Sequence, residues 1–183
     1  LRQHQMRHYQ ERAVDTYVGE PFRAVDLQLQ GLSQTGAATY GTPAEWALVV
    51  KRVQAIPAYL AAARTQIEAG VASGHTADRR MLKRDGLDTS ATNAAYFGQT
   101  LPSLAASRLT AGPDHDRLLA GLKAAGGDAA KAYTAFRTFI ATTFFEKDGT
   151  TIKPAFAADN FALGKTEYDW ALQNNFQIGR AHV

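Results

Sequence analysis

The sequence predicts an all-α protein, folded as an antiparallel bundle-like array of helices, and two observations carry this prediction. Large apolar residues in the stretch 42–71 recur in alternating steps of three and four, which places them on one face of a helix: Trp46, Val49, Val53, Ile56, Leu60, Ala63, Ile67 and Val71. The chain is also rich in alanine, the residue with the highest helix propensity. We therefore expect the other elements to pack around this long helical stretch.

Length and composition describe an ordinary globular chain. Its 183 residues, 45% hydrophobic and 20% charged, suit one domain with a real core. The net charge of +3 is too small and too scattered to indicate a nucleic-acid partner. There is no cysteine, which excludes a disulfide framework and a thiol nucleophile. No apolar run approaches the ~20 residues of a membrane span, and no signal peptide is visible, so the sequence predicts no compartment.

Residues 1–42 are interpreted as an N-terminal helical and loop segment. His4 and His8 lie four residues apart, with Glu11 one turn further, so they could share a helix face and bind a metal. Because glutamine rather than glutamate follows His4, the metallopeptidase pattern is absent and a solvated surface pair is preferred. A short helix is expected near 21–32, with Pro21 at its first position, followed by a loop to Gly41.

The long helical stretch has a predicted start and a predicted interruption. Thr42 is expected to cap it, with Pro43 in the first turn and Glu45 favoured at the positive end of the helix. Pro57 lies inside the apolar pattern, where its ring removes a backbone hydrogen bond and costs ~3 kcal/mol in a straight helix. A kink or short break is therefore predicted near 54–57.

Between residues 76 and 113 the pattern indicates two shorter helices. The first is expected from Thr76 to about Arg84, with the basic run 79–84 as a solvated face, and is ended by a turn at Asp85–Gly86. Thr89 or Ser90 would cap the second, which Pro102 bends or ends. Its apolar face would contain Ala94, Phe97, Leu101 and Leu104.

From residue 114 onwards, three more helices are predicted. Asp114 and Asp116 favour a helix start, with His115 in its exposed first turn, and Gly126–Gly127 would stop this helix. The segment 138–145 would also suit a strand, but a helical stripe begins before it, formed by Ala129, Tyr133, Phe136, Ile140 and Phe144. A turn at 147–149, an extended segment up to Pro154 and a last helix from Lys165 to about Phe176 follow.

Common catalytic signatures are absent from these residues. There is no H-E-x-x-H, no Gly-rich phosphate loop, no G-x-S-x-G and no pair of cysteine ligands. Tyr168 and Trp170 could line a ligand cleft, although packing is the commoner use of aromatic residues at helical spacing. No catalytic, cofactor-binding or metal-ligating residue is therefore predicted in this chain.

The order of several segments resembles a known family. Residues 45–60 contain E-W-A-L-V-V-K-R-V-Q-A-I-P-A-Y-L, and A-A-K-A-Y-T-A-F-R-T-F-I and F-A-L-G-K-T-E-Y-D-W-A-L follow later. This set is similar to the bacterial family called domain of unknown function 885, over about residues 43–177. The residues that carry most of the resemblance are Arg52, Ile56, Pro57, Leu60, Gly164 and Tyr168.

The resemblance implies a mostly helical protein that is similar to zinc metallopeptidases. In that family an H-E-x-x-x-G-H-type segment would supply two zinc-binding histidines and a glutamate that activates water. Residues 1–183 contain no such segment, so no catalytic residue is carried over and no cofactor is expected in this region. Residues 43–177 are expected to be the N-terminal helical part of a larger zinc-dependent protein, with the remainder of that chain and a peptide-like substrate as partners.

The two ends of the sequence support the same expectation of an incomplete chain. Residues 178–183, I-G-R-A-H-V, break the amphipathic pattern and are expected to be a non-native tail, and the first residue is not methionine. The alternative is a freestanding, non-enzymatic helical interaction module. A truncated wall of a larger protein should expose a contiguous apolar patch, whereas a freestanding module should have polar outer faces.

Overall fold

The computed structural model describes residues 14–34, 41–157 and 165–174. In these residues every regular element is a helix, apart from a single β-bridge between Phe145 and Ile152. The all-α prediction is therefore confirmed. The histidine pair at 4 and 8 and the expected tail at 178–183 lie outside the described residues.

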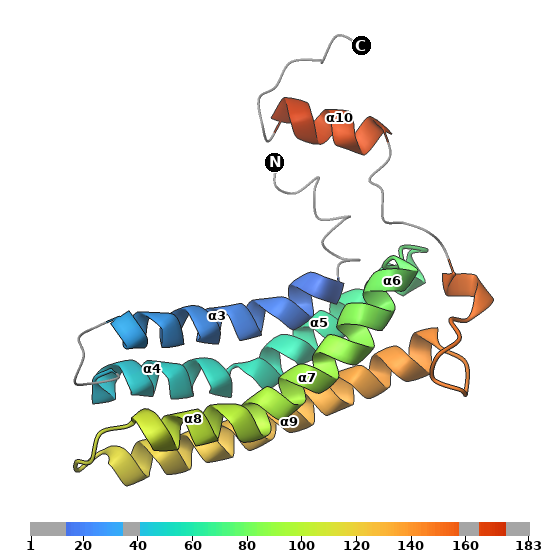
Figure 1. Ribbon diagram of the computed structural model, residues 1–183. Helices are drawn as coiled ribbons and strands as arrows, with labels where there is room; N and C mark the ends of the chain where they lie inside the picture. The colour runs from blue at the N-terminus through green and yellow to red at the C-terminus, as the bar shows by residue number, and fades with distance from the viewer. Residues whose placement is uncertain (1–13, 35–40, 158–164, 175–183) are drawn as a thin grey trace.

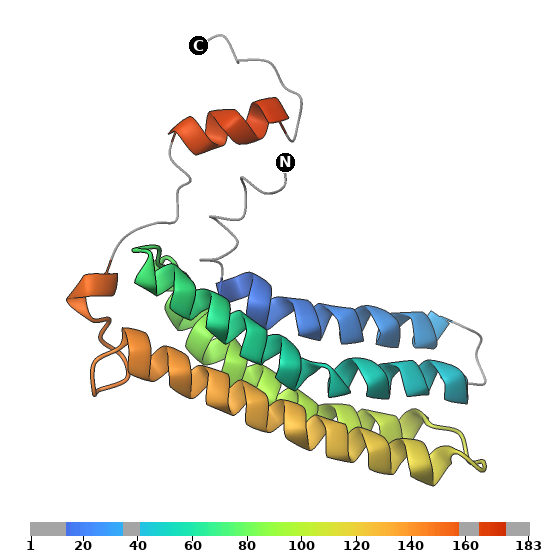
Figure 2. The same ribbon diagram turned by 180° about the vertical axis from the view of Figure 1, so that it is seen from behind.

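The helices form four long runs (Figures 1 and 2). The first run is α3 (Val14–Gln34), and the second is α4 (Pro43–Gln54) with α5 (Ile56–Ala72). The third run joins five segments, two of them π-helical: α6 (Arg79–Met81), η1 (Leu82–Thr89), α7 (Ser90–Ala95), η2 (Tyr96–Thr100) and α8 (Leu101–Arg108). The fourth run is α9 (His115–Phe144), and η3 (Pro154–Phe156) and α10 (Lys165–Asn174) follow it.

Two helices of the bundle each lie between the second and third runs. α3 packs against α4 and α5 on one side and against η1 on the other. α9 packs against α4 and α5, and also against η1, α7, η2 and α8. Both helices therefore connect the second run to the third, and the 30-residue α9 does so over more segments than α3.

α3 is longer than the predicted helix at 21–32, because its apolar stripe begins before the proline. Val14 and Val18 are fully buried and continue the stripe of Val25 and Leu29. Pro21 lies inside the helix rather than at its start. Because proline has no amide hydrogen, Pro21 cannot make the helical hydrogen bond to the carbonyl of Tyr17, four residues earlier. The next carbonyl, that of Val18, accepts side-chain hydrogen bonds from two other helices.

The second run has the start and the interruption that the sequence predicts. The Thr42 hydroxyl accepts a hydrogen bond from the Glu45 amide at 3.3 Å, and the Glu45 carboxylate accepts one from the Thr42 amide at 2.7 Å. Together these two hydrogen bonds form a complete capping box. The run breaks at Ala55, whose amide donates to the Arg52 carbonyl at 3.2 Å. Both halves bury their apolar stripe in the same core, from Trp46 to Ile67.

The predicted turn at Asp85–Gly86 is wrong, since both residues lie buried inside η1. A Cβ atom on Gly86 would approach Ile140 Cγ2 to 2.7 Å, so this glycine permits close contact with α9. The predicted start at Thr76 and cap at Thr89 or Ser90 are also wrong. Asp78 caps α6 by accepting the Arg80 amide, and Ser90 continues the helix with its hydroxyl bonded to the Asp85 carbonyl.

α9 continues through Gly126–Gly127, where the sequence predicts a stop. A Cβ atom on Gly126 would lie 2.3 Å from the Phe97 carbonyl oxygen, so glycine allows this helix to touch the backbone of η2. The predicted start near Asp114 and the stripe that includes Tyr133 and Phe136 are confirmed.

A short hairpin follows α9 and stabilises its carboxyl end. Lys153 Nζ donates to the Thr142 and Thr143 carbonyls at 2.7 and 2.9 Å, which satisfies two acceptors of the last turn. The Asp148 carboxylate accepts the Thr151 hydroxyl and the Thr150 and Thr151 amides, which lowers the pKa of Asp148 to about 2. The turn predicted at 147–149 is therefore confirmed, with Gly149 at a positive φ of 70°.

The last helix, α10, does not bury its tyrosine. Tyr168 is 56% exposed, so the expectation that it packs in the core is wrong. Trp170 on the same helix is half-buried.

Candidate functional site: a groove between α5 and α9

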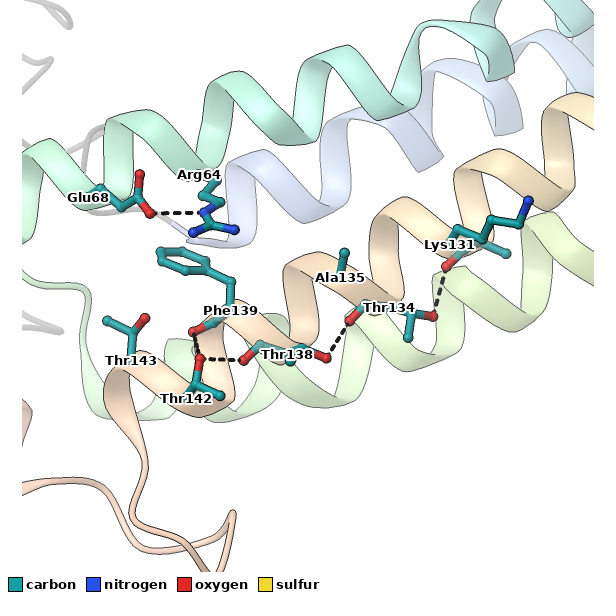
Figure 3. A pocket seen from close by; sticks show the side chains of 10 residues that line it. Arg64, Glu68, Lys131, Thr134, Ala135, Thr138, Phe139, Thr142 and Thr143 are labelled. Atoms are coloured by element: carbon teal, nitrogen blue, oxygen red, sulfur yellow. Dashed lines mark hydrogen bonds and ion pairs between the residues drawn. The ribbon is translucent and has the colours of Figure 1, made fainter.

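An open groove of about 770 Å³ runs along the outer side of the bundle between α5 and α9 (Figure 3). Polar side chains and small residues make up most of its lining: Arg64, Glu68, Ala130, Lys131, Thr134, Ala135, Thr138, Phe139, Thr142 and Thr143. Two of these residues come from α5 and the other eight from α9. The groove is thus mainly the outward face of the helix whose inward face builds the core.

Three threonines line α9 at intervals of one turn. The hydroxyls of Thr134, Thr138 and Thr142 each donate to the carbonyl four residues earlier, at 2.8, 3.0 and 2.9 Å. Each hydroxyl proton is used in this way, so what the oxygens can still offer a ligand is lone pairs. This side of the groove can therefore accept hydrogen bonds from the amides of a bound chain.

Arg64 is the positioned cation of the groove. Its Nε donates to Glu68 Oε1 at 2.9 Å, and its guanidinium carbon lies 4.8 Å from the centre of the Phe139 ring. Figure 3 shows the guanidinium beside the Glu68 carboxylate and over this ring. Because both charged side chains are about half exposed, the ion pair contributes at most ~1 kcal/mol to stability. Its main consequence is to orient the guanidinium.

A buried polar cluster lies on the opposite face of α9 and joins three helices. Asn93 Nδ2 and the Tyr133 hydroxyl both donate to the Val18 carbonyl, at 3.1 and 3.0 Å. The Tyr133 ring stacks on Phe97 with the centroids 5.7 Å apart. Burial raises the pKa of Tyr133 well above its ordinary value, so its proton stays on the oxygen. This cluster holds the bundle together and offers no reactive group.

A second charged cluster lies where α3 meets η1. Arg84 donates through Nε and Nη2 to the two carboxylate oxygens of the buried Asp85, at 2.9 and 2.8 Å. This bond is the main cause of the raised pKa of Arg84, and the charge of Asp15 adds to it. One Asp15 carboxylate oxygen is buried without a hydrogen-bond partner. The single positive charge of Arg84 is thus paired with Asp85 and also attracted by Asp15.

The described residues do not fit a zinc ion. Among residues 14–34, 41–157 and 165–174, no group of three or more histidine, cysteine, aspartate or glutamate side chains could hold a metal. His115 lies in the first turn of α9 as predicted, with Nδ1 2.8 Å from the exposed Asp116 carboxylate. No reaction step through zinc can be derived from these side chains.

An apolar seam lies on another outer face, between α3 and the α4–α5 run. Arg52 Nη1 donates to the Ala24 carbonyl at 2.6 Å across this seam. Leu27 lies one turn after Ala24 and Leu48 one turn before Arg52, so in these antiparallel helices both lie on the same side of the bond. They are 66% and 48% exposed. A pocket of about 300 Å³ lies around the bond and beyond it, lined by Glu20, Pro21, Ala24, Arg52, Ala55, Ile56 and Tyr59.

Sequence reasoning predicted no site residue and so missed the groove. One signal was present, because threonine disfavours helix and yet recurs every fourth residue from 134 to 142. The partnership of Arg64 with Phe139 had no local signal, since the two residues lie on different helices. The basic run 79–84 behaves as predicted, with Arg79, Arg80, Lys83 and Arg84 all exposed.

Comparison with known proteins gives one match. A family model described as "Bacterial protein of unknown function (DUF885)" matches residues 1–180, a wider range than the resemblance over 43–177. No curated protein and no solved structure matches the chain. In the part of the chain that the structure describes, no helix has the length and apolar character needed to cross a membrane.

Proposed function

This chain belongs to the DUF885 family, and from that premise we propose that it is the N-terminal helical part of a zinc-dependent, metallopeptidase-like hydrolase. In this proposal the groove between α5 and α9 forms one wall of the substrate cleft and orients a peptide-like substrate. The zinc ligands and the catalytic glutamate would come from an H-E-x-x-x-G-H-type segment, which residues 1–183 do not contain.

The groove is the observation that carries this proposal. It follows α9 from Ala130 to Thr143, a rise of ~20 Å along the helix axis. An extended peptide of about six residues has this length. Threonine oxygens can accept its amide hydrogen bonds, and Arg64 and Lys131 can donate to its carbonyls. A wall of this kind binds and orients a substrate without reacting with it.

The apolar seam supports the part of the proposal that concerns a larger protein. Three of the four large apolar side chains that are exposed among the described residues lie along it, namely Leu27, Leu48 and Tyr59. Exposed apolar side chains that gather on one face commonly mark a surface that another element covers. In a longer protein this seam would be the place where further chain packs.

The proposal is tested by comparing this chain with a longer DUF885 protein that carries both this helical region and the H-E-x-x-x-G-H-type segment. The longer protein should contain one zinc per molecule by mass spectrometry and hydrolyse peptides, and residues 1–183 alone should do neither. Thr138→Arg in the longer protein should fill the groove and lower kcat/KM without zinc loss. Tight stoichiometric zinc on residues 1–183, or no hydrolysis by the zinc-loaded longer protein, would contradict the proposal.

A freestanding interaction module is the alternative, and the closed interior of the bundle favours it. The four runs bury their large apolar residues against one another, including Trp46, Phe97, Tyr133 and Phe144. A module of this kind should unfold cooperatively as a monomer and bind no apolar dye. Dye binding that Leu27→Lys with Leu48→Lys abolishes would instead favour the wall.

A further inference from the structure

We propose that the α5–α9 groove selects peptide segments that carry an acidic side chain, whose carboxylate binds the Arg64 guanidinium. The peptide nature of the ligand rests on the proposed function. The carboxylate at Arg64 rests on the contacts within the groove.

The arrangement around Arg64 leaves one side of the guanidinium available. Nε is used by Glu68, and the face of the group lies against the Phe139 ring. Among the described residues, Nη1 and Nη2 of Arg64 donate to no protein acceptor. These two nitrogens form an end-on fork, the geometry in which arginine donates two parallel hydrogen bonds to one carboxylate. Since Glu68 and Phe139 hold the side chain in place, less conformational entropy is lost on binding.

The position of Arg64 along the groove indicates a side-chain carboxylate rather than the end of a peptide. Arg64 lies beside Phe139, and the groove continues past this point to Thr142 and Thr143. In the other direction it continues to Thr134 and Lys131 (Figure 3). A peptide that fills the groove therefore extends beyond Arg64 in both directions. The carboxylate that it presents to Arg64 then belongs to a side chain and not to the end of the peptide.

The charges of the lining agree with an acidic ligand. Arg64 and Lys131 are the basic residues of the lining, and Glu68 is its one acidic residue. Glu68 is already paired with Arg64 Nε. Lys131 Nζ lies 3.3 Å from Oδ1 of Asp128, a residue that is not part of the groove lining. An incoming carboxylate thus meets the unoccupied end of an arginine, whereas a basic side chain would meet like charge.

The test is a binding measurement on residues 1–183 by fluorescence anisotropy. The probes are fluorescein-labelled hexapeptides of alanine and serine with blocked ends and one central glutamate, together with the matched glutamine peptide. The glutamate peptide should bind about tenfold more tightly than the glutamine peptide, because only its carboxylate can form charge-assisted hydrogen bonds with the Arg64 guanidinium. Arg64→Ala should remove this difference, and Arg64→Lys should restore only part of it.

Arg117→Ala is the matched control, because Arg117 is an exposed arginine on α9 that pairs with Asp114 away from the groove. It should leave both affinities unchanged, and circular dichroism should show that all variants fold. Equal binding of the two peptides, or discrimination that survives Arg64→Ala, would overturn the proposal. So would equally tight binding of a glutamine peptide with a free carboxyl end, since the carboxylate would then be terminal.

This experiment separates the inference from the proposed function. It measures binding on the helical chain and needs neither zinc nor hydrolysis. If the unchanged chain binds the glutamate and glutamine peptides equally, the role of Arg64 is wrong, but the protein could still be part of a hydrolase that binds neutral peptides. If the longer protein has no hydrolytic activity, the proposed function is wrong, but the α5–α9 groove could still bind acidic peptides.

Discussion

The two faces of α9 are built for different purposes. The inward face brings Gly126, Ala129, Tyr133, Phe136 and Ile140 into the core, where each is buried. The outward face presents threonines to an open groove, and their hydroxyls bond back to their own helix. Stability should therefore depend mainly on the inward side of the helix, and the exposed threonines of the outward side should be replaceable without unfolding the bundle.

The first and largest test of this difference concerns two adjacent glycines. Gly126→Ala should lower the free energy of unfolding by about 3 kcal/mol, because the new methyl group would overlap the Phe97 carbonyl. Gly127→Ala meets no atom within 4 Å and should instead gain about 0.5–1 kcal/mol from helix propensity. Urea denaturation followed by circular dichroism measures both. Equal stability of the two variants would contradict the close contact between α9 and η2.

The second test concerns the shared acceptor at Val18. Tyr133→Phe and Asn93→Ala each remove one of its two side-chain donors and should each cost about 1 kcal/mol. The double variant removes both of these donors from the carbonyl. Its loss of unfolding free energy should therefore exceed the sum of the losses in the two single variants. A double-mutant cycle in urea measures the excess. Simple additivity would show that the two donors act independently.

The smallest effect is expected on the outward face. Thr138→Ala removes a hydroxyl that bonds only within α9 and lines the groove. The free energy of unfolding should change by less than about 0.5 kcal/mol, since alanine favours helix and the site is exposed. The same denaturation experiment measures it. A loss above about 1 kcal/mol would mean that the groove face contributes to folding, and the contrast between the faces would fail.

Local patterns were enough to predict several features of the fold. The apolar stripe from Trp46 to Ile67, the Thr42 cap and the break before Pro57 each depend on residues within a few positions of one another. The physical causes are the helical period, the free amides of a first turn and the missing amide of proline. These causes act in the same way whatever the rest of the chain does.

The glycines show where local reasoning failed. Asp85–Gly86 and Gly126–Gly127 have the composition of turns, yet both lie inside helices. A side chain at Gly86 would collide with Ile140, and one at Gly126 would collide with the Phe97 carbonyl. Both of these neighbours come from other helices, so the need for glycine depends on the packing. A glycine that permits close contact looks the same in sequence as a glycine that ends a helix.

By itself the sequence determined the helical class, the buried face of the stretch from Trp46 to Ile67 and the family to which the chain belongs. Only the tertiary structure decided that the third run continues through two π-helical segments, and that Val18, Asn93 and Tyr133 meet in the core. It also decided that Arg64 rests on Phe139 beside a groove. The reason is physical: helical periodicity is a local property, whereas these contacts join residues far apart in the chain and exist only once the helices have packed.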